Sequence, residues 1–193
     1  FTGEMENGED SSRDFAESSD SDQDQELIAL QLIDAVVDND CDEVKRLLDA
    51  GGDENTIDKQ RNASLLELAC YYENPGVAEL LLERGASPRA KYDEGKETPL
   101  QIAIKKGDGA SAVAILNKYE KEKEENKLSE EDRTLSQEDW NESLILAAHK
   151  GEQKLVERLI TLGADQGYSS KRNSFTLLHS AASSKNLRLF KYV

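Results

Sequence analysis

A short pattern that recurs along the chain limits its fold more than any other feature. Residues 98–103 read TPLQIA, and altered forms occur as LILAA at residues 144–148 and as TLLHSAA at residues 176–182. Each is followed by a polar or glycine break and then by an apolar helical stretch, such as VERLI at residues 156–160. Recurrence of one pattern predicts an array of stacked repeats, which bury their apolar residues between neighbours rather than in one globular core.

The order of these segments resembles the ankyrin repeat, a β-turn plus two helices with a period of about 33 residues. The family pattern is Thr-Pro-Leu-His, paired small residues, a turn glycine, a Val/Leu-rich helix and a closing Gly-Ala. Residues 64–70, SLLELAC, begin a close match that ends at Gly85-Ala86. The resemblance implies an all-α fold, an ankyrin-repeat solenoid of stacked helix-turn-helix units with β-turn fingers.

The resemblance covers residues 27–193 and divides them into four to five copies. The first copy lacks a finger and resembles an N-terminal capping repeat, and the last stops within its second helix, as expected of a fragment of a longer protein. The third copy loses the closing Gly-Ala. We expect the copies at residues 27–56, 57–89, 90–118, 140–167 and 168–193.

The residue types at fixed positions in each copy have a physical reason. A leucine begins each first helix, and a small residue follows one helical turn later on the same face, which lets neighbouring helices approach closely. Glycines stand where the second helix must end, at a position that commonly needs a left-handed backbone. The leucines are Leu32, Leu66, Leu100, Leu144 and Leu178, and the glycines are Gly51, Gly85 and Gly163.

The negative charge of the chain, −16 overall, is concentrated in two segments. Residues 1–26 hold ten acidic residues against Arg13 alone, which predicts a disordered acidic tail. Residues 119–139 form an acidic insertion between the third and fourth copies. Its first half is compatible with an extension of the preceding helix, and its second half with a loop. We expect Trp140 to pack the resumed stack; the alternative is that the insertion is itself a docking segment.

Several function classes lack the residues they need. His149 and His179, the two histidines, have no setting for nucleophilic catalysis, and the scattered cysteines and histidines lack the spacing of a zinc site. By resemblance, His179 hydrogen-bonds backbone groups. Cys70 replaces a small repeat residue and is expected to be buried. The acidic charge argues against nucleic-acid binding. We therefore expect neither an enzyme nor a metal or other cofactor.

The function implied by the resemblance is binding of a protein partner on the concave surface of the solenoid. In the family, contacts come from finger tips and from exposed residues before the turn that joins the two helices. Two adjacent tyrosines at such a position suggest aromatic anchors, and nearby lysines suggest an acidic peptide or domain as the partner. The candidate binding residues are Tyr71, Tyr72, Tyr92, Lys105, Lys106, His149, Lys150, Lys171 and Arg172.

Four serines are candidate phosphorylation sites, because each precedes an acidic residue by three positions: Ser19, Ser21, Ser129 and Ser136. A further hypothesis is that the acidic tail folds back onto the lysines of the candidate binding surface and competes with the partner. Phosphorylation would add negative charge and strengthen this contact. No apolar stretch is long enough to cross a bilayer. We expect a monomeric, intracellular interaction module, cytoplasmic or nuclear. The alternative is a regulatory or substrate-recruiting region of a larger enzyme or channel.

Overall fold

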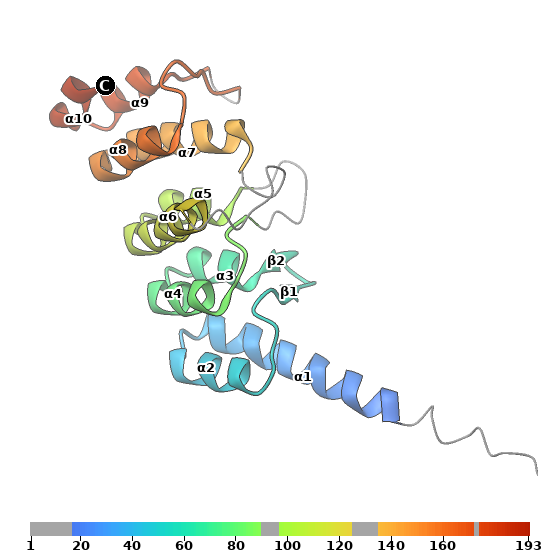
Figure 1. Ribbon diagram of the computed structural model, residues 1–193. Helices are drawn as coiled ribbons and strands as arrows, with labels where there is room; N and C mark the ends of the chain where they lie inside the picture. Colours follow the sequence, from blue (N-terminus) through green and yellow to red (C-terminus); the bar gives the residue numbers. More distant parts are fainter. Residues whose placement is uncertain (1–16, 90–96, 125–134, 172–173) are drawn as a thin grey trace, which may run out of the picture.

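The computed structural model describes residues 17–89, 97–124, 135–171 and 174–193, and in these residues the helices form pairs that stack in sequence order (Figure 1). The fold is the all-α solenoid that the sequence predicts. The pairs are α1 (Glu17–Val37) with α2 (Cys41–Asp49), α3 (Leu65–Tyr71) with α4 (Pro75–Arg84), α5 (Pro99–Lys106) with α6 (Gly109–Glu124), α7 (Gln137–Lys150) with α8 (Gln153–Leu162), and α9 (Leu177–Ser183) with α10 (Leu187–Tyr192).

Fingers project from the stack between the helix pairs. The second repeat has a short antiparallel hairpin of β1 (Ile57–Asp58) and β2 (Ala63–Ser64), with Ile57 opposite Ser64. A single antiparallel bridge between Ser169 and Thr176 marks the finger before α9. The fingers and the first helix of each pair therefore form one side of the array.

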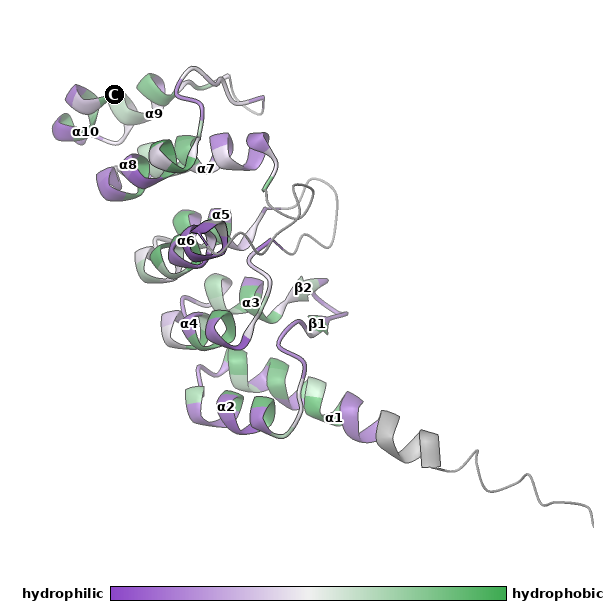
Figure 2. Ribbon diagram, in the orientation of Figure 1, coloured by the Kyte–Doolittle hydropathy of each residue, from purple (hydrophilic) through white to green (hydrophobic). Residues whose placement is uncertain are grey.

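One continuous apolar core runs through the stack, and apolar residues recur in every helix pair (Figure 2). Leu32, Leu66, Leu100 and Leu144, which begin the repeat pattern, are at most 1% exposed. Their neighbours in the next repeat cover them, as nearest-neighbour stacking requires. Leu178 holds the same position in the last pair but is 52% exposed, because no described residues stack over α9.

Local caps fix where the helices begin and end. Ser64 and Thr98 accept a hydrogen bond from the backbone N–H three residues later, and Glu67 and Gln101 complete reciprocal capping boxes. At the other end, Gly85 closes α4 with a φ of 112°, a left-handed conformation that disfavours residues with a Cβ atom.

Polar side chains also join neighbouring repeats. The buried Asn74 donates from Nδ2 to the Val36 carbonyl, 2.8 Å away, and Asn186 makes the same kind of bond to Gly151. Gln101 donates to the Asp139 carbonyl at 3.2 Å. The three carbonyls also accept a hydrogen bond from within their own repeat, so these bonds add a direct link between each repeat and its neighbour.

The predicted boundaries of the tail and the insertion differ from the observed helices. α1 begins at Glu17, so residues 17–26 are helical rather than part of a disordered tail; acidic residues near a helix N-terminus are favoured by the helix dipole. Residues 1–16 lie outside the described residues. α6 continues to Glu124, and α7 begins at Gln137 rather than at residue 140.

Ion pairs hold the extended end of α6 against the rest of the array. Glu122 is 2.7 Å from the Arg89 guanidinium, and Glu120 is 2.8 Å from that of Arg158 on α8. Both α6 residues lie in the segment expected to be an insertion. Contacts with neighbouring repeats therefore make this end of the insertion part of the stack.

Trp140 packs the resumed stack, as the sequence predicts. Its side chain is 8% exposed, and its ring meets that of Tyr119 edge to face with centroids 5.1 Å apart. The Tyr119 hydroxyl donates to the Pro88 carbonyl, and the Arg89 guanidinium lies over the Tyr119 ring. Leu135 is buried nearby in sequence, just before α7. The described end of the insertion is thus anchored by an aromatic pair.

Candidate functional site

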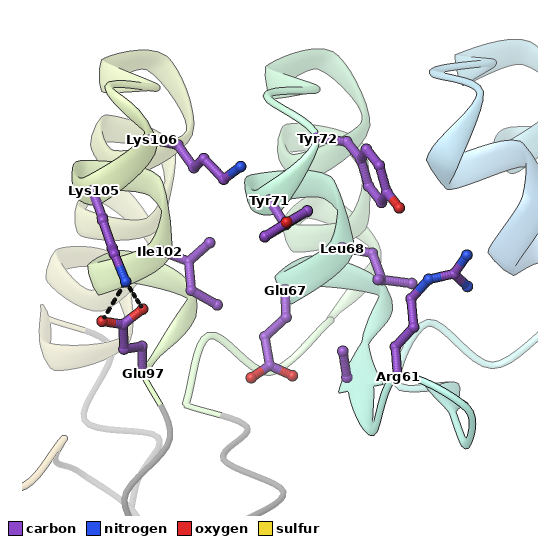
Figure 3. Close-up of a pocket in the computed structure, with 10 residues that line it drawn as sticks. Arg61, Glu67, Leu68, Tyr71, Tyr72, Glu97, Ile102, Lys105 and Lys106 are labelled. Carbon is purple, nitrogen blue, oxygen red and sulfur yellow. Dashed lines mark hydrogen bonds and ion pairs between the residues drawn. The ribbon is translucent and has the colours of Figure 1, made fainter.

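A hollow in the described residues lies between α3 and α5, on the side of the array formed by the first helices and the fingers. We call this side the inner face, and it is the surface that the resemblance predicts to be concave. The hollow encloses about 740 Å³ and is shown in Figure 3. It is lined by Arg61, Ala63, Glu67, Leu68, Tyr71, Tyr72, Glu97, Ile102, Lys105 and Lys106.

Tyr71 and Tyr72 stand at the end of α3 and are 53% and 38% exposed. Their rings meet edge to face with centroids 5.3 Å apart. The preceding α3 residues Leu65, Leu66 and Cys70 are buried, so the core already holds this helix without the two rings. Exposed aromatic side chains at the edge of a hollow are typical of residues that anchor a partner.

Two lysines of α5 face this hollow but are held differently. Lys106 reaches toward α3, and its Nζ lies 3.7 Å from the centroid of the Tyr71 ring (Figure 3). Lys105 Nζ is 3.1 Å from both carboxylate oxygens of Glu97. Lys106 thus has no ion pair with another described residue, whereas much of the charge of Lys105 is compensated by Glu97.

The finger of the second repeat supplies Arg61 to the hollow. Arg61 Nη1 is 2.5 Å from a carboxylate oxygen of the buried Asp58, and the other oxygen accepts the Gln60 N–H at 2.8 Å. Burial by itself would raise the pKa of Asp58, but the hydrogen bonds from Arg61 and from the backbone outweigh it and hold that pKa below its ordinary value. An ionised Asp58 therefore fixes the finger and the position of Arg61.

A second hollow of about 360 Å³ adjoins the first, since Arg61 lines both. It lies between α1 and the same finger. Leu30 and Ile57 line it and are 54% and 37% exposed. Glu26 and Asp34 of α1 line it as well. The repeat pattern does not indicate this α1 side as a binding surface, because its residues lie before the helix-end pair at which the family makes contacts.

The remaining predicted binding residues lie farther along the stack. His149 and Lys150 are exposed at the end of α7, and His149 Nδ1 is 2.9 Å from the Ser183 hydroxyl. That hydroxyl also lies 2.8 Å from the Ser180 carbonyl, to which it donates. Lys171 binds Glu138 at 2.7 Å. Tyr92 and Arg172 lie outside the described residues.

The structure thus brings Tyr71, Tyr72, Lys105 and Lys106 together around one hollow. The sequence pattern identified these four residues from their place at the helix ends. It gave no signal for Glu97 as the partner of Lys105 or for Ile102 as part of the lining. Both follow from how α3 and α5 pack, which a repeat pattern does not specify in detail.

Among the candidate phosphorylation sites, only Ser136 has a described side chain. Its exposed hydroxyl caps α7, accepting the Asp139 N–H at 3.2 Å and donating to the Asp139 carboxylate at 2.6 Å. Helix α1 includes Ser19 and Ser21, but the structure does not describe their side chains. Ser129 lies outside the described residues.

The other residues considered for chemistry have local partners. His179 Nδ1 is 2.7 Å from the Thr176 hydroxyl, and its ring stacks on Phe175, so in the described residues its ring is held by side chains rather than by the predicted backbone groups. Cys70 is fully buried, as expected. The described residues contain no group of three histidine, cysteine or acidic side chains placed to hold a metal ion.

Comparison with protein families agrees with the repeat architecture. A family model described as ankyrin repeats, three copies, matches residues 32–127. The match includes every residue that lines the hollow between α3 and α5, whereas the hollow beside α1 is lined in part by residues before the match. No helix among the described residues is long and apolar enough to cross a membrane. Ankyrin repeats generally mediate protein–protein interaction, and typically without catalysis. The helix pairs, the fingers and this match together establish that the chain belongs to the ankyrin-repeat family.

Proposed function

We propose that this chain is an interaction module that binds a protein partner on its inner face, with Tyr71 and Tyr72 as the anchoring residues. The observation that carries the proposal is that both rings are exposed at the edge of the 740 Å³ hollow. Tyrosine buries a large area on binding and loses little side-chain entropy, so it is enriched among residues that dominate binding energy.

The lysines of the inner face support a partner that contributes acidic groups there. Lys106 lies against Tyr71, and Lys150 is exposed on the next inner helix along the stack. A carboxylate that reaches Lys106 would also contact the Tyr71 ring edge. Charges of this kind set the register and the on-rate of a complex more than its affinity.

The unpaired cysteines are consistent with an intracellular location. Cys41 is exposed and Cys70 is buried, and both are free thiols. Reduced cysteines are typical of compartments in which glutathione and thioredoxin keep thiols reduced. We therefore propose that the interaction takes place in the cytoplasm or nucleus. We also propose that the array acts as a monomer.

The experiment is affinity capture from a cell lysate with the wild-type chain and with the double variant Tyr71→Ala/Tyr72→Ala. The control is Tyr192→Ala, which removes a tyrosine of similar exposure from α10, away from the hollow. Circular dichroism should show all three chains equally helical. Proteins captured by the wild type and the control but lost by the double variant support the proposal; identical captures by all three chains contradict it.

A further inference from the structure

From the charges along the inner face we infer that the partner segment is bipolar: its basic end lies over α1, an apolar side chain enters the hollow between α3 and α5, and its acidic end lies over α5. This inference rests on the proposed function and specifies the ligand of the same surface. It differs from a uniformly acidic ligand, which the lysines alone would suggest.

The residue pairs at the ends of the inner helices change character along the stack. The pair on α1 carries one acidic residue, the pair on α3 is aromatic, the pair on α5 carries two lysines, and the pair on α7 carries one. The pairs are Val37 and Asp38, Tyr71 and Tyr72, Lys105 and Lys106, His149 and Lys150, and Ser183 and Ser184. The charge therefore changes from negative on α1 to positive on α5, with the two tyrosines where the sign changes, and falls to zero at the α9 pair.

The two hollows repeat this gradient. The one beside α1 is lined by three carboxylates and two cations, and the one beside α5 by three cations and two carboxylates. Within the hollow beside α1, Arg61 is bound by Asp58, while the exposed Glu26 and Asp34 have no ion pair with another described residue. These two carboxylates would attract a lysine or arginine of the ligand.

The hollow between α3 and α5 offers the opposite charge next to an apolar surface. Glu97 compensates Lys105 and Asp58 compensates Arg61, so Lys106, which lies over the Tyr71 ring, is the lining cation that has no ion pair with another described residue. Below the rings, Leu68 and Ile102 supply apolar lining from facing helices (Figure 3). An apolar side chain can be buried there while a following carboxylate reaches Lys106.

The distance between the two ends gives the length of the segment. Packed helices lie about 8–10 Å apart, so α1 and α5, separated by α3, lie about 20 Å apart. An extended peptide rises about 3.3 Å per residue, so about six residues span this distance. A basic and an acidic residue about six positions apart, with an apolar residue between them, would fit both hollows.

The test uses the full chain and a phage-displayed library of nine-residue peptides. The central position holds Leu, Phe, Tyr or Trp, and the flanking positions are drawn from Lys, Glu and Ser. We expect the enriched peptides to carry lysine on one side of the central residue and glutamate on the other. Enrichment of peptides with glutamate on both sides would overturn the bipolar ligand and leave the proposed function standing.

Charge-reversal variants assign each end to its hollow. Lys105→Glu/Lys106→Glu should select peptides without glutamate, Asp34→Lys/Asp38→Lys should select peptides without lysine, and each should weaken the wild-type peptide about tenfold. The control Lys121→Glu reverses an exposed lysine on α6, outside the inner face. It should change neither the selected peptides nor the affinity for the wild-type peptide. Unchanged selection in both inner-face variants would overturn the inference.

A final arm separates this inference from the proposed function. Sorting the same library against Tyr71→Ala/Tyr72→Ala should give no enrichment. If that variant enriches the same peptides as the wild type, the tyrosines are not anchors, and the proposed function fails together with the inference.

Discussion

Lys106 of α5 lies over the ring of Tyr71 of α3, with Nζ 3.7 Å from the ring centroid, and so links two neighbouring repeats across the hollow. At an exposed site such a cation–π contact contributes about 0.5–1 kcal/mol. We expect that coupling energy from a double-mutant cycle of Tyr71→Leu and Lys106→Met, measured by urea unfolding. Because Lys106→Met keeps an aliphatic side chain of similar length, additive single effects would show that the charge contributes nothing.

The contact between Trp140 and Tyr119 should be a principal support of the junction around the insertion. Trp140→Ala removes a buried ring that packs on Tyr119 and is expected to lower the free energy of unfolding by about 3–5 kcal/mol. Urea unfolding followed by circular dichroism measures this, since the variant lacks the tryptophan needed for fluorescence. Trp140→Phe should cost much less, and equal losses in both variants would contradict a packing role.

Two leucines at the same repeat position provide a matched test of stacking. Leu144 is fully buried between repeats, and Leu178 is 52% exposed. Leu144→Ala should cost about 2–5 kcal/mol, and Leu178→Ala about 1 kcal/mol or less. The measurement is urea unfolding of both variants beside the wild type. Similar costs at the two positions would mean that burial by the following repeat does not govern stability at this position.

The two cysteines should react at very different rates. Cys41 is exposed, whereas Cys70 is fully buried, and burial raises the pKa of the Cys70 thiol, as do the nearby Asp108 and Glu67 carboxylates to a smaller extent. Because the thiolate is the reactive form, a disulfide reagent should modify Cys41 quickly and Cys70 only on unfolding. Cys41→Ser should therefore show no fast phase; a fast phase in that variant would contradict the burial.

The ion pair between Asp58 and Arg61 should make the finger sensitive to acid. The pKa of Asp58 is lowered in the folded chain, so its stabilising effect is present above the ordinary carboxyl pKa of about 3.9 and is lost as the pH falls through the lowered value. Wild type should exceed Asp58→Asn in urea midpoint at pH 7, and the difference should shrink below about pH 4. A difference that is the same at both pH values would point to a role independent of charge.

The sequence by itself determined the elements and most of their ends. The repeated leucines, the capping residues Ser64 and Thr98 and the closing Gly85 act within a few positions of the chain, so a local pattern is sufficient to locate them. The position of Tyr71 and Tyr72 at an exposed helix end follows from the same repeat register. Binding residues in fingers were less predictable, because Lys171 is bound by a residue of another repeat.

Only the tertiary structure decided which charges remain available and where the insertion joins the stack. Arg158 meets Glu120, 38 positions away on another helix, and Glu97, just before the start of α5, compensates Lys105 near its end. The hollow beside α1 arises because the finger of the second repeat folds against that helix, so Leu30 and Ile57 both line it. These relationships depend on side-chain packing between repeats, which the repeat pattern requires to exist but does not specify residue by residue.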